Sequence, residues 1–422
     1  MPTPDVVTVP QVAAVGSAVP AGNWNNGFNN VGSNANFWTS EPNGSNAWNR
    51  NIDTGTSVNE NNNNQYNGFS VRLVQDSAEG NFLDEASLFS LLYWSYMAAR
   101  CRKRNTPKQL EFEADVGKNL LELSRELHGR TWKPSPCTCF IITEPVKREV
   151  VAANFRDRVV HHLLCSWLFP IFERQFIYDS YSCRIGKGTL FGVNRVRKFV
   201  RAASDDFRRD AWILRLDIKG FFMHIDKEIL YSLLMDGISR GRYAGVSDKS
   251  LCDYLVDMTV HNDPLENAIY NSSPDAWNDL PKDKSLKYSG DGKGLPIGNL
   301  TSQLYANVYL NPLDQFVKRA LKVRWYGRYV DDMVLVDRDK EKLLECVGDI
   351  KEYLHKNLGL VLHPSKVQMQ SAKYGFSFLG CYILPYRVYP GNRLRKKLNS
   401  VRDIADFNGI CCHLNGTSCK KR

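Results

Sequence analysis

Two adjacent aspartates, Asp331 and Asp332, stand between two short, mainly apolar runs and constrain the fold more than any other feature of the sequence. Residues 323–326 precede the acids and residues 333–336 follow them, so the pattern predicts a β-hairpin with both carboxylates at its tight turn. Neighbouring carboxylates repel each other, so a bound cation would stabilise such a turn, and Mg²⁺ is usually held by one or two carboxylates plus substrate phosphates. A solvated acidic turn is the alternative, and a third carboxylate would decide between the two.

A third carboxylate does follow a predicted buried strand, residues 212–217, which reads Trp-Ile-Leu-Arg-Leu-Asp and ends in Asp217. A carboxylate at the end of an apolar strand is costly to bury unless it is paired or bound to a metal. Three carboxylates on two adjacent strand ends can hold two Mg²⁺ ions for in-line displacement at phosphorus. Lys366 follows a short predicted strand and could protonate a pyrophosphate leaving group. The sequence therefore predicts a phosphoryl-transfer site.

Further residues are candidates to line this site. Phe222, five residues beyond Asp217, would leave no space for a 2′-hydroxyl, with ordinary core packing as the alternative. The loop at residues 294–303 opens an apolar helix, and its glycines would let the backbone pack against a flat substrate such as a base pair. Basic residues at two predicted junctions could hold a triphosphate or a nucleic-acid backbone, with a solvated basic face as the alternative. These are Lys147, Arg148, Arg156, Arg158 and Arg184.

The charge of the chain is unevenly distributed. The 422 residues carry a formal net charge of +10, which suggests an acidic partner such as nucleic acid. Residues 1–99 nevertheless contain eight acidic and two basic residues, a net charge of −6. The remainder therefore carries +16, and two regions of different chemistry are joined near residues 80–100. The sequence shows neither an apolar run long enough for a membrane span nor a signal peptide, which predicts a cytoplasmic protein.

Residues 21–70 are rich in asparagine, which accounts for 17 of these 50 residues. Asparagine and glycine favour turns, so we expect an irregular segment without long regular elements, and a disordered polar tract is the simplest interpretation. The genetic code offers another. The asparagine codons AAC and AAT are rich in adenine, and changing their adenines varies the amino acid widely without creating a stop codon.

Hydrophobic periodicity predicts the remaining elements. The long segment 262–293 is expected to be a loop or insertion, and free thiols are expected for the scattered cysteines, with a weak zinc motif in the tail (Cys411, Cys412, His413, Cys419). Helices are predicted at residues 83–100, 109–127, 155–172, 193–203, 227–235, 250–261, 300–311, 340–358 and 394–407, and strands at 139–143, 360–362 and 376–383.

In their order along the chain, these motifs resemble those of reverse transcriptases: Asp217 with Phe222, the 294–303 loop, Tyr329-Val330-Asp331-Asp332, Lys366 and Phe378-Leu379-Gly380. The resemblance implies an α+β, right-hand polymerase fold with fingers, palm and a short thumb. It implies fingers at residues 79–210, a palm with the catalytic aspartates at 211–385 and a short basic thumb or tail at 386–422. No maturase or endonuclease domain is expected after residue 390.

The 294–303 loop departs from the Gly-x-Pro-Gln-Gly pattern of group II intron and retron enzymes, because Ile297 stands in the glutamine position. Its Ile-Gly-x-x-x-Ser-Gln pattern resembles reverse transcriptases of diversity-generating retroelements, which copy a template RNA with errors at adenines. Loss of a hydrogen-bonding side chain beside the nascent base pair would weaken base selection. Residues 66–72 resemble the C-terminus of the C-type-lectin-like proteins that these elements diversify, so residues 1–78 are interpreted as a translated template repeat. A ligand-binding segment is the alternative.

The resemblance also implies the ligands of the site. Asp217, Asp331 and Asp332 would bind two Mg²⁺ ions, with Mn²⁺ able to substitute, and Lys366 would act as proton donor. Template RNA, cDNA and dNTPs are the expected substrates and products, and a small basic accessory protein is the expected partner of a bacterial or phage-encoded enzyme. A retron-like or intron-derived polymerase without mutagenic bias remains the alternative; the complete acidic triad argues against a non-enzymatic RNA-binding scaffold. The residues expected to contact dNTP or template are the five basic residues above with Phe222, Pro296, Ile297, Gly298, Gln303 and Tyr329.

Overall fold

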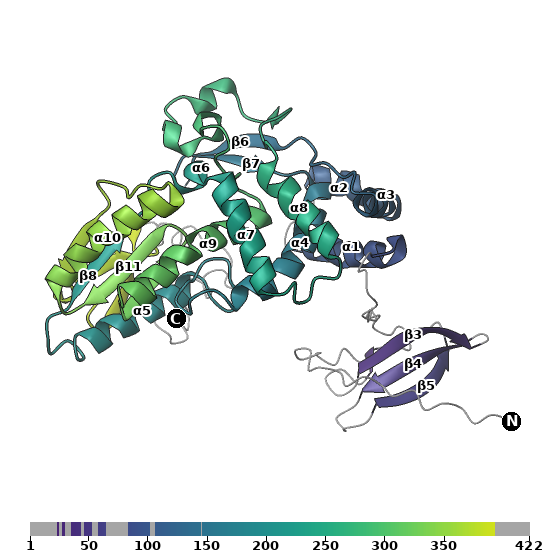
Figure 1. Cartoon of the computed structure of the whole chain (residues 1–422), viewed down its shortest axis with the longest axis horizontal. Helices are drawn as coiled ribbons and strands as arrows, with labels where there is room; N and C mark the ends of the chain where they lie inside the picture. Colours follow the sequence, from purple (N-terminus) through teal and green to yellow (C-terminus); the bar gives the residue numbers. More distant parts are fainter. Residues whose placement is uncertain are drawn as a thin grey trace, which may run out of the picture. The chain divides into compact units, whose positions relative to one another are not determined.

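The computed structural model describes residues 23–24, 28–29, 35–43, 46–52, 58–64, 83–101, 106–144 and 146–392. The chain forms two compact units, Met1–Glu79 and Gly80–Arg422 (Figure 1). The assignment of residues 1–78 to a translated repeat, and the limits given above for fingers, palm and thumb, remain predictions. The predicted helix at residues 394–407 and the tail cysteines lie outside the described residues.

The first unit contains β-strands in the segment that we expected to be irregular and to lack long regular elements. The strands β3 (Ala35–Asn43), β4 (Asn46–Ile52) and β5 (Val58–Asn64) form an antiparallel sheet, and β1 (Asn23–Trp24) pairs with β2 (Phe28–Asn29). The expectation of an irregular segment was therefore wrong. In an antiparallel ladder the backbone groups pair with one another, so asparagine side chains do not prevent pairing. The sequence signal we missed is Gly44-Ser45 between the paired Asn43 and Asn46, since a glycine followed by serine is typical of two-residue hairpin connections.

A layer of helices forms one end of the second unit (Figure 1). The long helix α4 (Phe155–Glu173) is buried along much of its length, and α1 (Glu85–Arg100) packs against both α4 and α3 (Val116–His128). The single helix predicted at residues 109–127 is in fact two, α2 (Pro107–Glu113) and α3. The reason is local: the Asp115 side chain accepts a hydrogen bond from the backbone N–H of Lys118 and caps a new helix.

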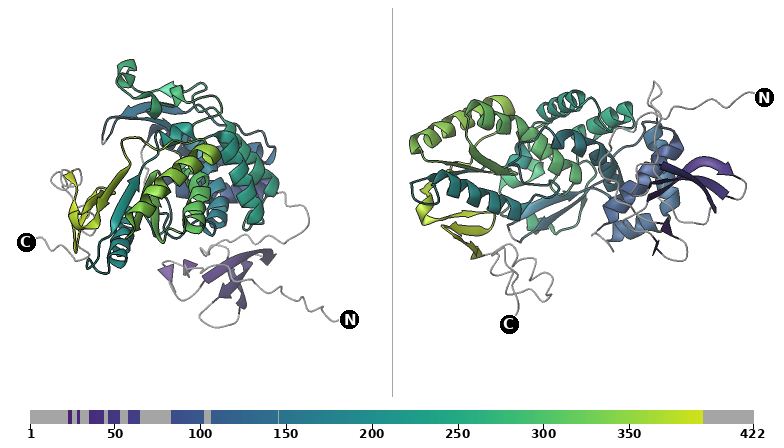
Figure 2. Two further views of the ribbon diagram at one scale, coloured as in Figure 1. Left: turned by 60° about the vertical axis from the view of Figure 1, so that its left-hand side comes forward. Right: turned by 90° about the horizontal axis from the view of Figure 1, so that it is seen from below.

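A four-stranded antiparallel sheet in the order β10-β11-β8-β12 lies in the predicted palm. Its strands are β8 (Trp212–Leu216), β10 (Trp325–Tyr329), β11 (Asp332–Asp337) and β12 (Gln368–Ser371). Alternate residues serve two cores, because Leu214 and Leu335 join the large helical core while Ile213 and Val334 join a second one. Helix α10 (Lys340–Leu358) covers the first face and α5 (Thr189–Ala203) the other, as the right-hand view of Figure 2 shows.

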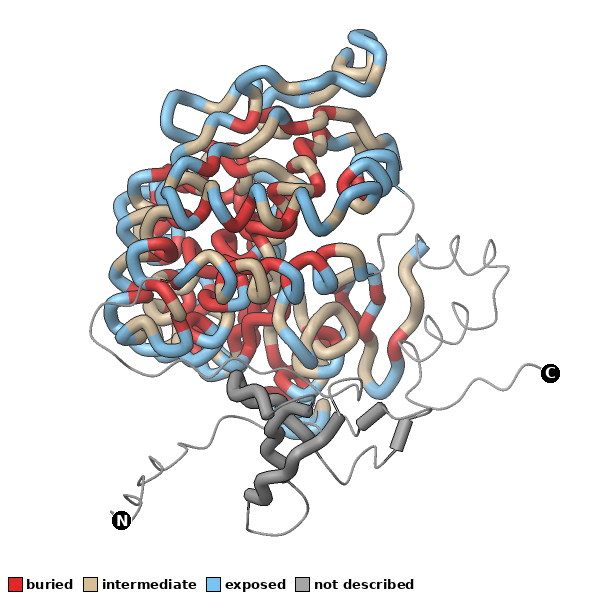
Figure 3. Tube along the Cα trace, turned by 90° about the vertical axis from the view of Figure 1, so that its right-hand side faces the viewer, coloured by how far each residue is buried: buried red, intermediate tan, exposed pale blue. Residues whose placement is uncertain are grey.

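The larger core runs through the helices of the second unit, and Figure 3 shows many buried stretches of the chain in the interior of this unit. Besides α1, α3, α4 and α10, it includes α7 (Lys227–Arg240), α8 (Lys249–His261) and α9 (Leu300–Gln315), which continues as a π-helical turn, η4 (Phe316–Ala320). These helices agree with the predicted ones, although α7 and α9 run further. In the described part of the chain, no helix is long and apolar enough to cross a membrane.

The segment 262–293 is more ordered than the loop we expected. Its short strand β9 (Ile269–Tyr270) extends the sheet of β6 (Thr138–Ile142) and β7 (Arg148–Ala152), and three short 3₁₀ helices follow: η1 (Pro274–Trp277), η2 (Lys282–Lys284) and η3 (Leu286–Tyr288). The buried carboxylate of Glu149 on β7 organises it. This carboxylate accepts hydrogen bonds from Trp277 Nε1, Ser285 Oγ and the backbone N–H of Leu286.

A last antiparallel sheet, β13 (Phe376–Phe378), β14 (Cys381–Leu384) and β15 (Arg387–Pro390), packs on the second core. It follows β12 after a short 3₁₀ helix, η5 (Ala372–Tyr374), and a one-turn helix, α6 (Phe221–His224), follows β8. The strand predicted at residues 360–362 is reduced to a single bridge between Ile218 and Leu362. The cysteines of the described residues are free thiols, as predicted.

Candidate active site

The predicted hairpin is formed by β10 and β11. Tyr329 pairs with Asp332, so only Val330 and Asp331 lie between the paired strands. Val330 has a φ of 54°, which a β-branched residue rarely adopts and which costs on the order of 1–3 kcal/mol. The turn therefore places Asp331 at its tip and Asp332 at the start of β11, as the sequence predicts.

Asp217 meets this turn from the adjacent strand. The antiparallel pairing of Met333 with Leu216 places Asp332 and Asp217 next in register, where side chains on neighbouring strands come close. The backbone oxygen of Asp217 accepts a hydrogen bond from the N–H of His363, at 2.8 Å, which ties the end of β8 to the segment that carries Lys366. The three carboxylates predicted from separate motifs are thus brought together.

The close carboxylates make each other's ionised form less favourable. Burial, followed by the charges of Asp332 and Asp217, raises the pKa of Asp331 to about 7. Asp332 is exposed as a residue, yet loss of hydration around its carboxylate and the charge of Asp217 raise its pKa to about 6. Each shift means that the ionised form is unfavourable as the site stands, and a bound cation would reverse this.

Lys366 brings a positive charge to the site. Its Nζ lies 2.9 Å from both carboxylate oxygens of Asp217, which brings it into the site as predicted. Its side chain is 53% exposed, so the ammonium remains open to solvent. Among the described residues, no three His, Cys, Asp or Glu side chains form a ready-made metal cage. The donor set of three crowded carboxylates nonetheless fits a hard divalent cation, which prefers oxygen ligands.

An apolar patch that includes part of the segment after Asp217 brings together two of the predicted contact residues. Phe222 and Ile297 are half-buried and pack on one small cluster that includes Cys139 and Met223. The backbone joins the same elements, because the N–H of Leu295 donates to Phe222 O at 2.8 Å and the N–H of Val151 donates to Ile297 O at 3.1 Å. The loop before α9 is therefore fixed to both β7 and the segment that follows Asp217.

The other predicted contact residues lie at separate positions along the 294–303 loop and the hairpin. Gly298 has a φ of 129°, in a region that favours glycine, and Pro296 beside it is half-buried. Gln303 is exposed on the first turn of α9, and Tyr329 is half-buried against the second core. Direct contact of these four residues with dNTP or template remains a prediction.

The basic candidates mostly bind the protein itself. Arg184 donates to both carboxylate oxygens of Glu173, at 2.6 and 2.8 Å, and to two backbone oxygens. Arg156 forms an ion pair with Glu126, and Arg158 donates to Ala153 O at 3.0 Å, while burial lowers the pKa of Arg158. Lys147 Nζ donates to Asn278 O, and Arg148 is exposed. For Arg184, Arg156 and Lys147, contact with a nucleotide would require these bonds to be exchanged.

Sequence reasoning missed two charged residues that meet at the hairpin. Asp314 on α9 and Arg328 on β10 are both fully buried and form an ion pair of 2.7 Å. The available signal was a charged residue within each of two apolar stretches, since a buried charge is paired or bound to a metal.

Comparisons with known proteins agree with this geometry. A family model described as reverse transcriptase (RNA-dependent DNA polymerase) matches residues 146–383. Protein YkfC of Escherichia coli (strain K12) is 21% identical over 257 residues, covering 53% of this chain and 60% of that protein. The putative COX1/OXI3 intron 2 protein of Saccharomyces cerevisiae is 20% identical over 342 residues, covering 67% of this chain and 36% of that protein. The chain thus spans less than two thirds of the length of either relative.

Among solved structures, apo telomerase from Candida tropicalis, truncated from its C-terminal domain, is similar with a TM-score of 0.42 and 11% identity. The match covers 61% of this chain and 56% of that one.

Proposed function

The chain belongs to the reverse transcriptase (RNA-dependent DNA polymerase) family, and from this premise we propose that it copies RNA into DNA at the site formed by Asp217, Asp331 and Asp332. The observation that carries the proposal is the convergence of these three carboxylates at the ends of β8 and the β10–β11 turn, with the pKa values of Asp331 and Asp332 raised. Family membership itself confirms the predicted right-hand polymerase fold and the predicted class of enzyme.

In this proposal Asp217, Asp331 and Asp332 hold Mg²⁺, with Mn²⁺ able to substitute. Bound there, the ions would polarise the reacting phosphate and neutralise its developing charge. The protein supplies rigid positioning, because β-pairing fixes Asp332 beside Asp217 and the two-residue turn fixes Asp331. Lys366 extends an ammonium into the same site, where it can give a proton to the pyrophosphate leaving group.

The apolar patch would receive the sugar and base of the incoming nucleotide. Phe222 would leave no space for a 2′-hydroxyl and so select deoxynucleotides. Ile297 would lie beside the nascent base pair, with Pro296 and Gly298 shaping the loop, but without a side chain that can hydrogen-bond a base. This absence would loosen base selection, because hydrogen-bonding sites reject wrong substrates more strongly than apolar ones do.

The finer proposal is that the enzyme serves a diversity-generating retroelement and makes cDNA with errors at template adenines. Support comes from Ile297 in the loop pattern and from the asparagine-rich residues 21–70, whose codons suit adenine mutagenesis. The partners in this proposal are a template-repeat RNA and a small basic accessory protein. The alternative is a retron-like or intron-derived enzyme that copies adenines accurately, and the printed names of relatives such as nuclear intron maturase 1 of Arabidopsis thaliana keep it open.

Extension of a primer on an RNA template with Mg²⁺ tests the polymerase proposal. We expect Asp331→Asn to lower the extension rate by at least about 100-fold, because a charged ligand is lost. Asp337→Asn is the matched control, since Asp337 ends the same strand at its opposite end, beside Lys342. Equal rates for wild type and Asp331→Asn would reject the site.

Sequencing of cDNA made on the protein's own template RNA tests the finer proposal. Substitutions concentrated at template adenines are expected in the wild type, and Ile297→Gln should reduce them while Ile297→Leu should not. Faithful copying by the wild type would retain the polymerase and favour the retron-like or intron-derived alternative.

A further inference from the structure

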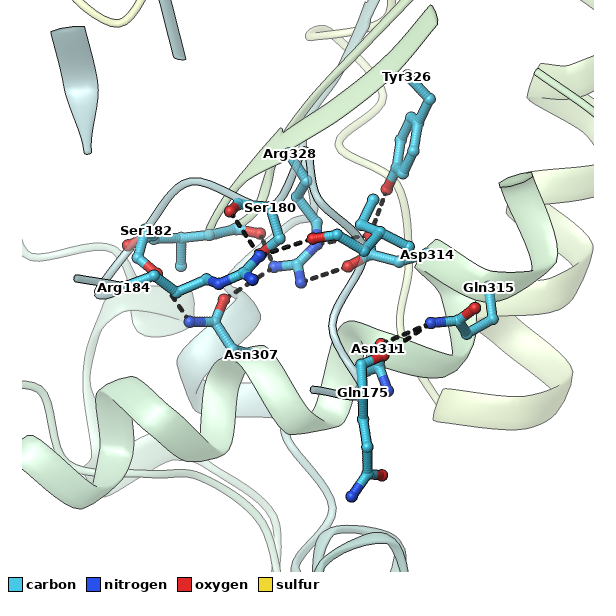
Figure 4. Close-up of polar contacts among 12 residues, drawn as sticks. Gln175, Ser180, Ser182, Arg184, Asn307, Asn311, Asp314, Gln315, Tyr326 and Arg328 are labelled. Carbon is cyan, nitrogen blue, oxygen red and sulfur yellow. Dashed lines mark hydrogen bonds and ion pairs between the residues drawn. The ribbon is translucent and has the colours of Figure 1, made fainter. Parts of the chain in front are cut away.

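A fully buried ion pair between Arg328 and Asp314 adjoins the acidic turn, and Figure 4 shows these two side chains pointing toward each other. Arg328 Nε and Nη2 donate to the two carboxylate oxygens of Asp314, at 2.8 and 2.7 Å, and Tyr326 Oη donates to the first of these oxygens at 2.7 Å. Neither charged side chain is exposed to solvent. The pair joins α9, which follows the 294–303 loop, to β10, which leads into Asp331 and Asp332.

One donor of this arginine is directed at the turn itself. Arg328 Nη1 donates to the backbone oxygen of Val330 at 2.8 Å. Val330 is the residue with a φ of 54°, and its oxygen belongs to the peptide that joins it to Asp331. A hydrogen bond at this position holds the peptide plane in place and therefore the direction in which Asp331 leaves the turn.

Further hydrogen bonds hold the backbone and the guanidinium of Arg328. Its backbone N–H donates to Asp179 O and its backbone oxygen accepts from the N–H of Tyr181, both at 2.9 Å. The same Nη1 approaches Asn307 Oδ1 at 3.4 Å, and Asn307 in turn donates to Ser182 O at 2.9 Å. The arginine whose Nη1 reaches Val330 is thus held by α9, which carries Asp314 and Asn307, and by the segment 179–182.

Stability alone does not account for this arrangement. Replacing a buried ion pair with apolar residues of similar volume is often neutral or stabilising, so the pair is weak evidence for a stabilising role. What an apolar pair could not provide is the hydrogen bond to Val330 O.

We propose that the buried Arg328–Asp314 pair positions the turn that carries Asp331 and Asp332, so that Arg328 and Asp314 act as positioning residues for nucleotide addition. This inference rests on the proposed function of that turn. Arg328 holds the Val330 peptide, Asp314 fixes the orientation of the guanidinium, and α9 transmits the position of the 294–303 loop to the acidic turn.

The central test uses an apolar triple variant, Arg328→Met with Asp314→Leu and Tyr326→Phe, which removes the buried charges together. Two quantities are measured: the single-turnover rate of nucleotide addition with its dNTP dependence, and Mn²⁺ binding followed by electron paramagnetic resonance, which needs no catalysis. We expect the variant to fold, the rate to fall about 100-fold, as misplacement by about 1 Å can cause, dNTP affinity to be unchanged and Mn²⁺ to bind more weakly. A folded triple variant with wild-type rate and Mn²⁺ affinity would overturn the proposal.

A conservative pair of variants decides the matter if the triple variant does not fold. Arg328→Lys keeps a positive charge but loses the planar guanidinium, which can donate to Asp314 and to Val330 O at the same time. Arg130→Lys is its matched control, because Arg130 pairs at 2.8 Å with Asp248, whose side chain is fully buried, and neither lies on the hairpin. Rate and Mn²⁺ affinity should fall in Arg328→Lys but not in Arg130→Lys at similar loss of stability; equal effects would overturn the proposal.

The two proposals can fail separately. If the wild type adds no nucleotide on any template, the proposed function fails, while Mn²⁺ binding still compares wild type with the Arg328 variants. Weaker Mn²⁺ binding in those variants would then support the positioning role, and unchanged binding would reject it.

Discussion

Two sets of carboxylates meet the same hairpin, and the protein treats them in opposite ways. Asp314 reaches it from α9, is fully buried and receives three hydrogen bonds from Arg328 and Tyr326. Asp331 and Asp332 stand at the turn, close to Asp217, with pKa values raised by lost hydration and by the charges of neighbouring carboxylates. The difference teaches that a carboxylate whose oxygens are already hydrogen-bonded by the protein has little capacity to bind a ligand. Crowded carboxylates without enough nearby positive charge are the ones that a bound cation stabilises most.

The largest expected change in stability concerns Asp314, the carboxylate that the protein itself pairs. Asp314→Asn should lower the free energy of unfolding by about 3–5 kcal/mol, because it leaves the charge of Arg328 buried without a counter-charge. Urea unfolding at pH 7.5 measures this, with Asp349→Asn, exposed on α10, as the control. A loss of unfolding free energy no larger than that of the control would mean that Asp314 does not balance the buried charge of Arg328.

The next largest expected change in stability concerns a buried histidine that the protein keeps neutral. His161 on α4 is buried with no hydrogen-bond partner for its Nδ1, and burial, with the charges of His162 and Arg158, lowers its pKa to about 3. The folded state therefore binds fewer protons than the unfolded state between about pH 3 and 6.5. Stability should fall as the pH drops through 6.5, by about 2 kcal/mol at pH 5.

His161→Phe should remove most of this dependence, because phenylalanine does not titrate. The measurement is the free energy of unfolding at pH 7 and pH 5 for the variant, the wild type and His355→Gln, which changes an exposed histidine on α10. Parallel losses in all three proteins would show that His161 is not held neutral.

The crowded set should respond in the opposite direction to Asp314. Asp331→Asn removes a charge that its neighbours repel, so the variant should be more stable than wild type by about 1 kcal/mol at pH 7.5 without divalent cations. Added Mg²⁺ should narrow the gap, because it stabilises the wild type by binding to its folded state. Calorimetry with and without Mg²⁺ makes the comparison, and a less stable variant would contradict the assignment of Asp331 to the undercompensated set.

The smallest effect concerns the ion pair between Lys366 and Asp217. The Lys366 side chain is 53% exposed, so Lys366→Met should change the free energy of unfolding by less than about 1 kcal/mol. A loss as large as that of Asp314→Asn would place Asp217 with the satisfied carboxylates rather than with the crowded ones.

The sequence predicts the parts of this site that follow from local patterns. The apolar runs around Asp331 and Asp332 indicate a hairpin, and the strand ending at Asp217 indicates a third acid, because strand periodicity and turn chemistry are short-range properties. Lys366 was placed in the site by its position in chain order, and the structure agrees.

Partners that lie far apart in sequence could not be predicted in this way. A free arginine and a paired one look alike in sequence, so Arg184 and Arg156 were candidates for nucleotide contact although Glu173 and Glu126 bind them. The pairing of Arg328 with Asp314 likewise depends on how α9 packs beneath the sheet. In the first unit, asparagine composition concealed the strands, because composition describes side chains whereas ladders form between backbones.

Glu149 has a consequence for the order in which the chain can assemble. The groups that it accepts from, on Trp277, Ser285 and Leu286, lie 128 to 137 residues further along the chain. During synthesis β7 is therefore made long before the segment that satisfies its buried carboxylate. We therefore expect residues 262–293 to settle after β7 has formed, with a protection from hydrogen exchange that depends on Glu149 as well as on the pairing of β9 with β6.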